Sequence, residues 1–242
     1  MRGGRHYIVV WCVVQESWGG VKVNHTSGVG ITGEGMDGLF IMQLFRSPAA
    51  FVLTVIGVVF SICVHEWCHA RVALAEGDDT ASRLGYLTFN PLVVMGWQSL
   101  VVLLFFGLAF GRVPVNVGRL RHRWSAALVS AAGPLANLGL SLSFLVLMRL
   151  LVSLEVVGGL GVLLSWSRLN LLLMVFNLLP VPPLDGWGVL EGVAPQWTRR
   201  LDGEKRGVMF FVLFGLLTLP VAQRLLDGVV DGLLKLMVEA LF

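Results

Sequence analysis

Three ionisable residues, His65, Glu66 and His69, together with Arg71 interrupt a stretch of chain that is otherwise apolar on both sides. They fit the pattern His-Glu-x-x-His, whose two histidines fall on the same face of a helix and can bind one metal ion. Ionisable groups inside an apolar helix are costly, so they indicate a functional site. The alternative is two core or surface histidines with a glutamate partner, which the cost of burying Glu66 makes unfavourable.

Zinc is the metal that this pattern favours. It binds imidazole nitrogen, and a catalytic zinc site has three protein ligands and a fourth position for water. Glu66 would lie beside that water as general base, because the metal lowers the pKa of the water to about 7. Cys68 lies about 60° around the helix from His65 and is either a further ligand or a small packing residue.

A third ligand has to come from a distant segment. Residues 177–190 read NLLPVPPLDGWGVL, and the three prolines cannot continue a regular helix. Asp185 follows them and could complete a His-His-Asp zinc site. The alternative is an aspartate that caps a helix in a loop at the membrane surface.

The composition indicates the elements that position these residues. Of the 242 residues, 56% are hydrophobic and 14% are charged, against about 25% charged in soluble domains. We expect an all-α polytopic membrane protein with about five to six transmembrane helices. The formal net charge of +3 gives no case for nucleic-acid binding, and the three cysteines, two of them in one apolar run, argue against a secreted disulfide scaffold.

The chain divides into three predicted parts. Residues 1–38 are rich in glycine and polar groups and predict a flexible extension, and residues 39–225 form the transmembrane core. Charged residues recur every four positions from Asp227 to Glu239, so residues 226–242 predict an amphipathic helix. Within the core, residues 85–91 have a composition typical of a short β-hairpin or re-entrant segment. The predicted apolar runs are 49–75, 84–111, 124–148, 169–184 and 207–223.

Basic residues collect in two connections, 112–123 and 199–206, whereas the connection near Glu155 has none. The positive-inside rule therefore places both basic connections in the cytoplasm and Glu155 on the other face.

Several motifs together resemble the site-2 protease family of intramembrane zinc metalloproteases. HEWCHA at 65–70 and NLLPVPPLDG at 177–186 match the two main motifs of the family in order and spacing. Residues 77–92 are similar to the segment that follows the histidines in compact bacterial members, and residues 130–142 resemble the Gly-x-x-x-Asn motif of the family. The resemblance extends over roughly residues 51–190.

The resemblance implies a role for each matched residue. His65, His69 and Asp185 would bind one zinc ion per chain, Glu66 would activate water, and Asn177 would stabilise the developing oxyanion. The implied substrate is a transmembrane protein helix that unwinds locally, as in regulated intramembrane proteolysis. The implied location is the bacterial cytoplasmic membrane, and we expect regulation by a membrane partner or by prior trimming of the substrate.

One segment departs from the family, and two other functions compete with proteolysis. After Asn90-Pro91-Leu92, residues 93–98 lack the His-x-Asp-Pro-x-Gly stretch of compact members, which puts the shape of the substrate channel in doubt. A metal transporter could use the same ligands but would need polar groups along a path. An inactive scaffold is the other alternative, against which the intact Glu66 argues. Asn137 is either a polar group facing substrate or an interhelical hydrogen bonder.

Overall fold

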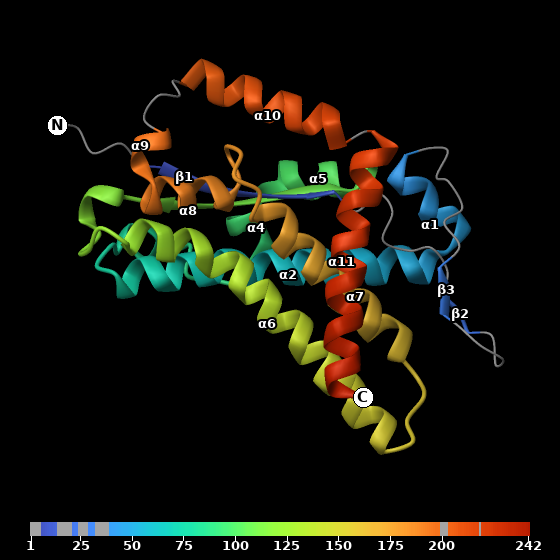
Figure 1. Ribbon diagram of the computed structural model, residues 1–242. Helices are drawn as coiled ribbons and strands as arrows, with labels where there is room; N and C mark the ends of the chain where they lie inside the picture. The colour runs from blue at the N-terminus through green and yellow to red at the C-terminus, as the bar shows by residue number, and fades with distance from the viewer. Residues whose placement is uncertain (1–5, 14–20, 24–28, 32–38, 199–202, 218) are drawn as a thin grey trace.

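The computed structural model describes residues 6–13, 21–23, 29–31, 39–198, 203–217 and 219–242. Within these ranges helices dominate (Figure 1), which confirms the all-α prediction. The helices are η1 Phe40–Met42, α1 Gln43–Arg46, α2 Pro48–Ala75, α3 Thr80–Arg83, α4 Pro91–Val94, α5 Gly96–Phe106, η2 Val117–Arg119, α6 Ser125–Ser153, α7 Leu160–Asn177, α8 Asp185–Val193, α9 Pro195–Thr198, α10 Gly203–Leu217 and α11 Pro220–Leu241. The strands are β1 His6–Val13, β2 Val21–Val23, β3 Val29–Ile31 and β4 Leu108–Val115.

Three of the described helices, α2, α6 and α7, are long and apolar enough to cross a membrane. Helix α5 is also apolar but shorter. The chain is therefore a membrane protein by length and composition of its helices, and the count of five to six spans stays a prediction. Helix α2 carries the His-Glu-x-x-His pattern and begins at Pro48, whose fixed φ angle suits the first turn of a helix.

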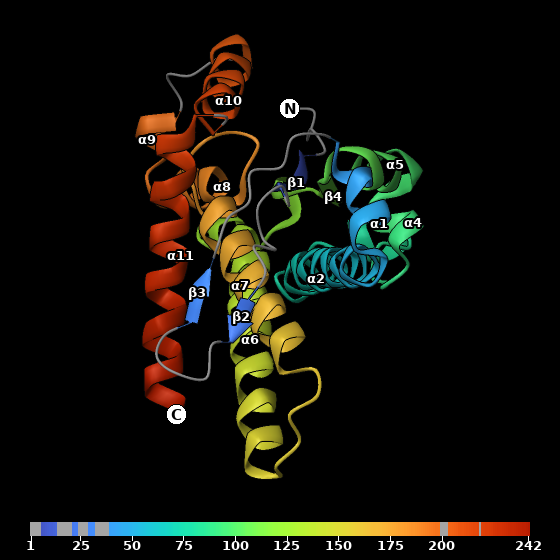
Figure 2. The ribbon, with the colours of Figure 1, turned by 90° about the vertical axis from the view of Figure 1, so that its right-hand side faces the viewer.

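Helices α6 and α7 form a hairpin of two long helices, and α2 packs across both of them. Figure 2 shows α2 nearly end-on beside the pair. The crossing of α2 and α7 is close at Gly57, where a Cβ atom would lie under 3.0 Å from the ring of Trp166. The Trp166 indole Nε1 donates a hydrogen bond to the Leu53 carbonyl at 3.2 Å. These contacts fix α7 against the helix that carries the histidines.

Helix α8 is positioned by two of its glycines. A Cβ atom at Gly188 would lie under 3.0 Å from Ser130 of α6, and one at Gly192 would lie equally close to Ala127. Small residues allow such a close approach of two helices. The beginning of α8, where Asp185 lies, is thus held against the helix that faces α2.

Strand β4 pairs antiparallel with β1, with Val10 opposite Gly111. Part of the stretch 1–38, for which the sequence predicts a flexible extension, therefore forms strands, and the remainder lies outside the described residues. Residues 85–91 contain turns and bends but no strand, and the extended segment of this region is β4, beyond α5. An extended strand here depends on pairing with a distant segment, which local composition does not reveal.

The C-terminal region consists of α10 and α11, and Pro220 occupies the first turn of α11. The apolar run predicted at 207–223 is thus divided between two helices, because proline favours a helix start. The amphipathic helix predicted for residues 226–242 corresponds to α11 and begins earlier, at Pro220.

Candidate metal centre

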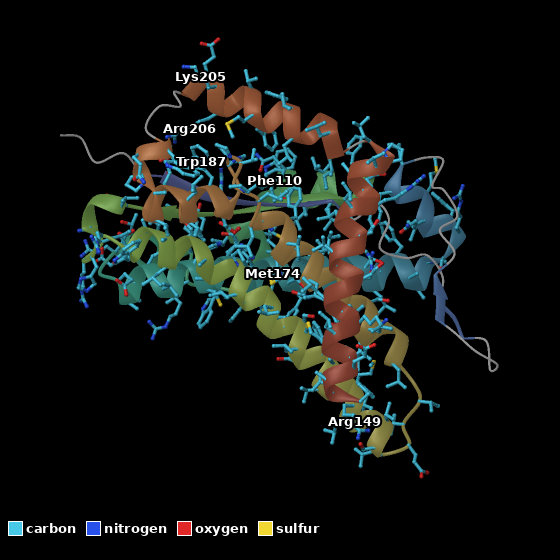
Figure 3. The ribbon with its side chains drawn as sticks, in the orientation of Figure 1. Phe110, Arg149, Met174, Trp187, Lys205 and Arg206 are labelled. Carbon is cyan, nitrogen blue, oxygen red and sulfur yellow. The ribbon has the colours of Figure 1, made fainter. Side chains whose placement is uncertain are left out.

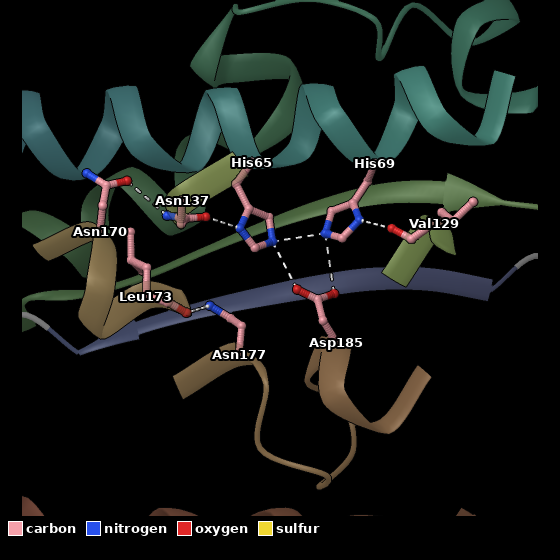
Figure 4. A network of polar contacts seen from close by, with 8 residues as sticks. All are labelled: His65, His69, Val129, Asn137, Asn170, Leu173, Asn177 and Asp185. Atoms are coloured by element: carbon pink, nitrogen blue, oxygen red, sulfur yellow. Dashed lines mark hydrogen bonds and ion pairs between the residues drawn. The ribbon is translucent and has the colours of Figure 1, made fainter. Parts of the chain in front are cut away.

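Three side chains from two distant parts of the chain meet between α2 and the start of α8 (Figure 4). The His65 Nε2 atom lies 3.0 Å from Asp185 Oδ2, and the His69 Nε2 atom lies 3.3 Å from Asp185 Oδ1. The two Nε2 atoms are 2.9 Å apart. All three side chains are buried, and their ligand atoms all lie within 4.8 Å of one another. The structure thus brings together the three ligands that the sequence predicts, as a group that can bind a metal ion.

The other nitrogen of each imidazole shows which atoms are available to a metal. The His69 Nδ1 atom lies 2.6 Å from the Val129 carbonyl oxygen, and the His65 Nδ1 atom lies 2.5 Å from Asn137 Oδ1. Both oxygens only accept hydrogen bonds, so each Nδ1 carries the proton and each neutral imidazole has a lone pair on Nε2. Two lone pairs and a carboxylate that face one another fit a cation between them, and this donor set suits zinc.

Asp185 supplies the negative charge of the group. Its two oxygens lie 3.0 Å from His65 Nε2 and 3.3 Å from His69 Nε2, the two nitrogens that carry lone pairs. An ionised carboxylate together with neutral imidazoles is the combination of forms that binds a metal.

Glycine is required where α6 passes the two imidazoles. A Cβ atom at Gly133 would lie under 3.0 Å from the Nε2 atoms of both His65 and His69. Any side chain there would fill the space in which the three ligand groups converge. The Gly-x-x-x-Asn pattern thus has a physical reason in this chain, because Gly133 leaves room for the imidazoles and Asn137, one turn later, contacts His65.

Glu66 lies next to the ligand group in the sequence and in the fold. It is fully buried, and neither carboxylate oxygen has a hydrogen-bond partner within the described residues. Strand β4 presses against it at Gly111, where a Cβ atom would lie under 3.0 Å from Glu66 Oε1. A buried carboxylate without a partner is costly, so its presence here points to a group that arrives during function.

Asn177 is fully buried at the last position of α7, on the same side of the imidazoles as Asp185 (Figure 4). Its Nδ2 atom donates to the Leu173 carbonyl at 2.8 Å, and its Oδ1 atom has no partner among the described residues. One amide hydrogen is therefore occupied by the backbone of α7. Cys68 is half-buried and is not part of the ligand group.

Comparison with known proteins agrees with this geometry. The chain is 35% identical to YwhC of Bacillus subtilis over 195 residues, which cover 75% of this chain and 89% of that protein. YwhC is named as a candidate zinc metalloprotease. The chain belongs to the site-2 protease family.

Other relatives carry the same kind of name. Rip2 of Mycobacterium tuberculosis strain H37Rv is 34% identical over 208 residues, which cover 81% of this chain and 78% of that protein. MJ0611 of Methanocaldococcus jannaschii is 30% identical over 165 residues, or 63% of this chain and 78% of that protein. Both are named as candidate zinc metalloproteases. No family model matches the sequence, and no solved structure matches it significantly.

Sequence analysis left the role of one buried polar residue of this site-2 protease family member open and did not identify another. Asn137 hydrogen-bonds between helices, which is one of its two predicted alternatives. Asn170 of α7 is fully buried and donates to Ser61 of α2, and nothing singled it out in the sequence. The signal that could have found it is a carboxamide in the middle of an apolar run, because polar residues inside apolar helices find partners or serve a function.

A cavity of about 680 Å³ lies beside α8, and Asp185 is the one residue of the ligand group that lines it. Its wall includes Ser130 and Val129 of α6 and Asp185 and Trp187 of α8. Figure 3 shows Arg206 of α10 above Trp187, and the guanidinium carbon lies 5.4 Å from the centre of the indole ring. The cavity therefore adjoins the ligand group at Asp185, whereas the two histidines do not line it.

Proposed function

We propose that this chain is an intramembrane protease that hydrolyses peptide bonds in transmembrane helices of protein substrates. We further propose that it crosses the bacterial cytoplasmic membrane several times. The support is the site-2 protease family membership, together with a metal-ligand group on α2, a helix of spanning length. The observation that carries the proposal is the buried, unpartnered carboxylate of Glu66 directly beside the ligand His65.

Each residue of the centre then has a task. His65, His69 and Asp185 would hold zinc, and the bound ion would supply a Lewis acid that lowers the pKa of water to about 7 and stabilises negative charge. Glu66 accepts the proton of the attacking water and returns it to the leaving amine. Its two oxygens fit this task, because no hydrogen bond from the described residues competes for them. Asn177 holds its amide at the edge of the centre, where its second hydrogen can donate to the carbonyl oxygen under attack.

The substrate has to be extended at the cut. In a helix each backbone carbonyl accepts a hydrogen bond from the N–H four residues later, and side chains surround the backbone. Both features keep the scissile carbonyl from the attacking water. The cavity beside Asp185 offers a route along which an unwound segment could reach the centre. A regulatory membrane partner that presents the substrate is part of the proposal.

The test is cleavage of a generic transmembrane substrate by the purified full-length chain in detergent or lipid. The wild-type protein should cut the substrate and lose this activity to a zinc chelator. Glu66→Gln should abolish cleavage while zinc content stays normal, because the glutamate is not a ligand. The matched control is Glu239→Gln, an isosteric change of a glutamate on α11 that should leave cleavage unchanged.

Two results would contradict the proposal. Cleavage by Glu66→Gln near the wild-type rate would remove Glu66 as the base. A wild-type protein that binds zinc and cuts no transmembrane substrate, but moves metal across a vesicle membrane, would favour the transporter alternative.

A further inference from the structure

Two buried carboxamides form a relay from the metal centre to the helix behind it. Asn137 of α6 and Asn170 of α7 are both fully buried. The His65 Nδ1 atom lies 2.5 Å from Asn137 Oδ1, and Asn137 Nδ2 donates to Asn170 Oδ1 at 3.1 Å. Figure 4 shows the three side chains in line, with Asn170 furthest from the two imidazoles.

The donor and acceptor of each hydrogen bond in the relay follow from the contacts of Asn170, the residue furthest from the metal centre. Asn170 Nδ2 lies 2.9 Å from the Trp166 carbonyl oxygen and 2.9 Å from Ser61 Oγ. A backbone carbonyl can only accept, so the atom that faces it must be the amide nitrogen. The Asn170 oxygen then accepts from Asn137, and the Asn137 oxygen must accept from His65 Nδ1. A backbone group on α7 thus determines which nitrogen of His65 carries the proton.

The other histidine needs no such relay. His69 Nδ1 donates a hydrogen bond directly to the Val129 carbonyl oxygen at 2.6 Å. A backbone carbonyl has no donor group that could take the place of this acceptor. An asparagine can rotate its amide by half a turn and present a donor where an acceptor is needed. The asparagine that faces His65 is therefore useful only if a second group fixes its orientation.

We propose that Asn137 and Asn170 are positioning residues that fix the tautomer and ring orientation of His65 and thereby set the metal affinity of the centre. Groups that hold the second nitrogen of a metal-bound histidine commonly tune affinity in this way. The inference rests on the proposed function only in taking His65 as a zinc ligand, and it does not depend on peptide-bond cleavage.

The competing explanation is that the relay only holds α6 and α7 together. The same pair of helices offers a matched control for this explanation. Ser141 Oγ and Ser167 Oγ are hydrogen-bonded at 2.8 Å, and both residues are fully buried. This bond also joins α6 to α7 but contacts none of the three ligands.

The experiment measures zinc affinity and melting temperature on the full-length protein. The protein is stripped of metal and titrated with Zn²⁺ in competition with a fluorescent zinc chelator. Asn137→Ala should weaken zinc binding by about 10–100-fold, the range for loss of such an orienting partner. Ser141→Ala should lower the melting temperature without changing zinc affinity. Asn170→Ala should give a smaller loss of affinity than Asn137→Ala, because His65 keeps an acceptor whose orientation is no longer fixed.

A conservative variant separates orientation from helix packing. Asn137→Asp keeps an oxygen for His65 Nδ1 but places a second oxygen against Asn170 Oδ1. We expect zinc affinity near that of the wild type together with a lower melting temperature. Cobalt(II) in place of zinc adds a spectroscopic signature, since its absorption spectrum should stay as in the wild type for Asn137→Asp and change for Asn137→Ala.

Several outcomes would overturn the inference. One is wild-type zinc affinity in Asn137→Ala, and another is an equal loss of affinity in Ser141→Ala. If Asn137→Ala cannot be purified folded, wild-type affinity in Asn170→Ala or lost affinity in Asn137→Asp overturns it. A wild-type protein that binds no zinc would instead contradict the proposed function, so the two failures are distinguishable.

Discussion

Two polar clusters lie on helix α7 or beside it. We call a cluster complete when its charged groups are paired with one another, and only one of the two is complete. In the cluster of Arg168, the guanidinium of α7 bonds two aspartates of α11, with Nη2 2.6 Å from Asp227 Oδ1 and Nε 2.7 Å from Asp231 Oδ1. In the metal centre, two imidazole Nε2 atoms face the carboxylate of Asp185, and Glu66 beside them has no hydrogen-bond partner in the part of the chain that the structure describes.

The difference separates structure from function. Charges in apolar helices are expensive whatever their purpose. In the Arg168 cluster, attraction between the guanidinium and the two aspartates offsets the cost of burying these charges. The cluster therefore holds α11 against α7 without any further group. The metal centre instead gathers two imidazole nitrogens and a carboxylate around one point, and this set of acceptor atoms fits a metal cation. Converging acceptor atoms that have no matching donor or cation within the described residues therefore distinguish the binding site from the structural cluster.

The largest effect should follow from removing a ligand from the incomplete cluster. We expect Asp185→Ala to lose zinc and cleavage together, by more than the factor of about 10–100 that is typical for an outer partner. Metal analysis and a cleavage assay on one preparation measure both. Full zinc content with full activity would show that Asp185 is not a zinc ligand and would leave the third ligand unidentified.

The next effect should follow from adding one methyl group beside the imidazoles. In Gly133→Ala the new Cβ atom would occupy the space between His65 and His69, so we expect strongly weakened zinc binding. Gly139→Ala is the matched control on the same helix, because its Cβ atom would meet no neighbour. Normal zinc affinity in Gly133→Ala would show that α6 can move away at no cost to the centre.

A smaller effect should follow from a change at the edge of the centre. Asn177→Ala should lower the cleavage rate by about 10²–10³-fold, the range for loss of one oxyanion donor, and leave zinc content unchanged. Asn90→Ala, which removes an exposed cap of α4, is the control. If Asn177 only caps the end of α7, the variant will melt earlier and turn over normally.

The smallest effect on the chemistry should follow from breaking the complete cluster. Arg168→Leu removes the partner of two partly exposed aspartates, and we expect a loss of up to about 1 kcal/mol of folding free energy with unchanged zinc affinity. Thermal unfolding and zinc titration measure the two quantities, and Arg168→Lys should recover part of the stability. Weakened zinc binding in Arg168→Leu would show that the two clusters are coupled, contrary to the comparison.

Much of this site could be predicted from local patterns. The spacing of His65 and His69 places them on one helical face wherever that helix packs, and the apolar surroundings make their burial costly in any fold. The all-α class follows equally from composition. The strand β4 could not be predicted in this way, because its partner β1 comes from the other side of α2 in the sequence.

The sequence by itself determined the helix that carries two ligands, the position of the general-base candidate and the class of membrane protein, since these depend on residues that are close along the chain. Only the tertiary structure decided that Asn137 and Asn170 form a chain of hydrogen bonds with His65, that Cys68 stays outside the ligand group and that Glu66 finds no hydrogen-bond partner among the described residues. These facts depend on where α6, α7 and β4 approach α2. Such approaches are set by packing at a few small residues, Gly57, Gly111 and Gly133, of which only Gly133 belongs to a motif that the sequence analysis singled out.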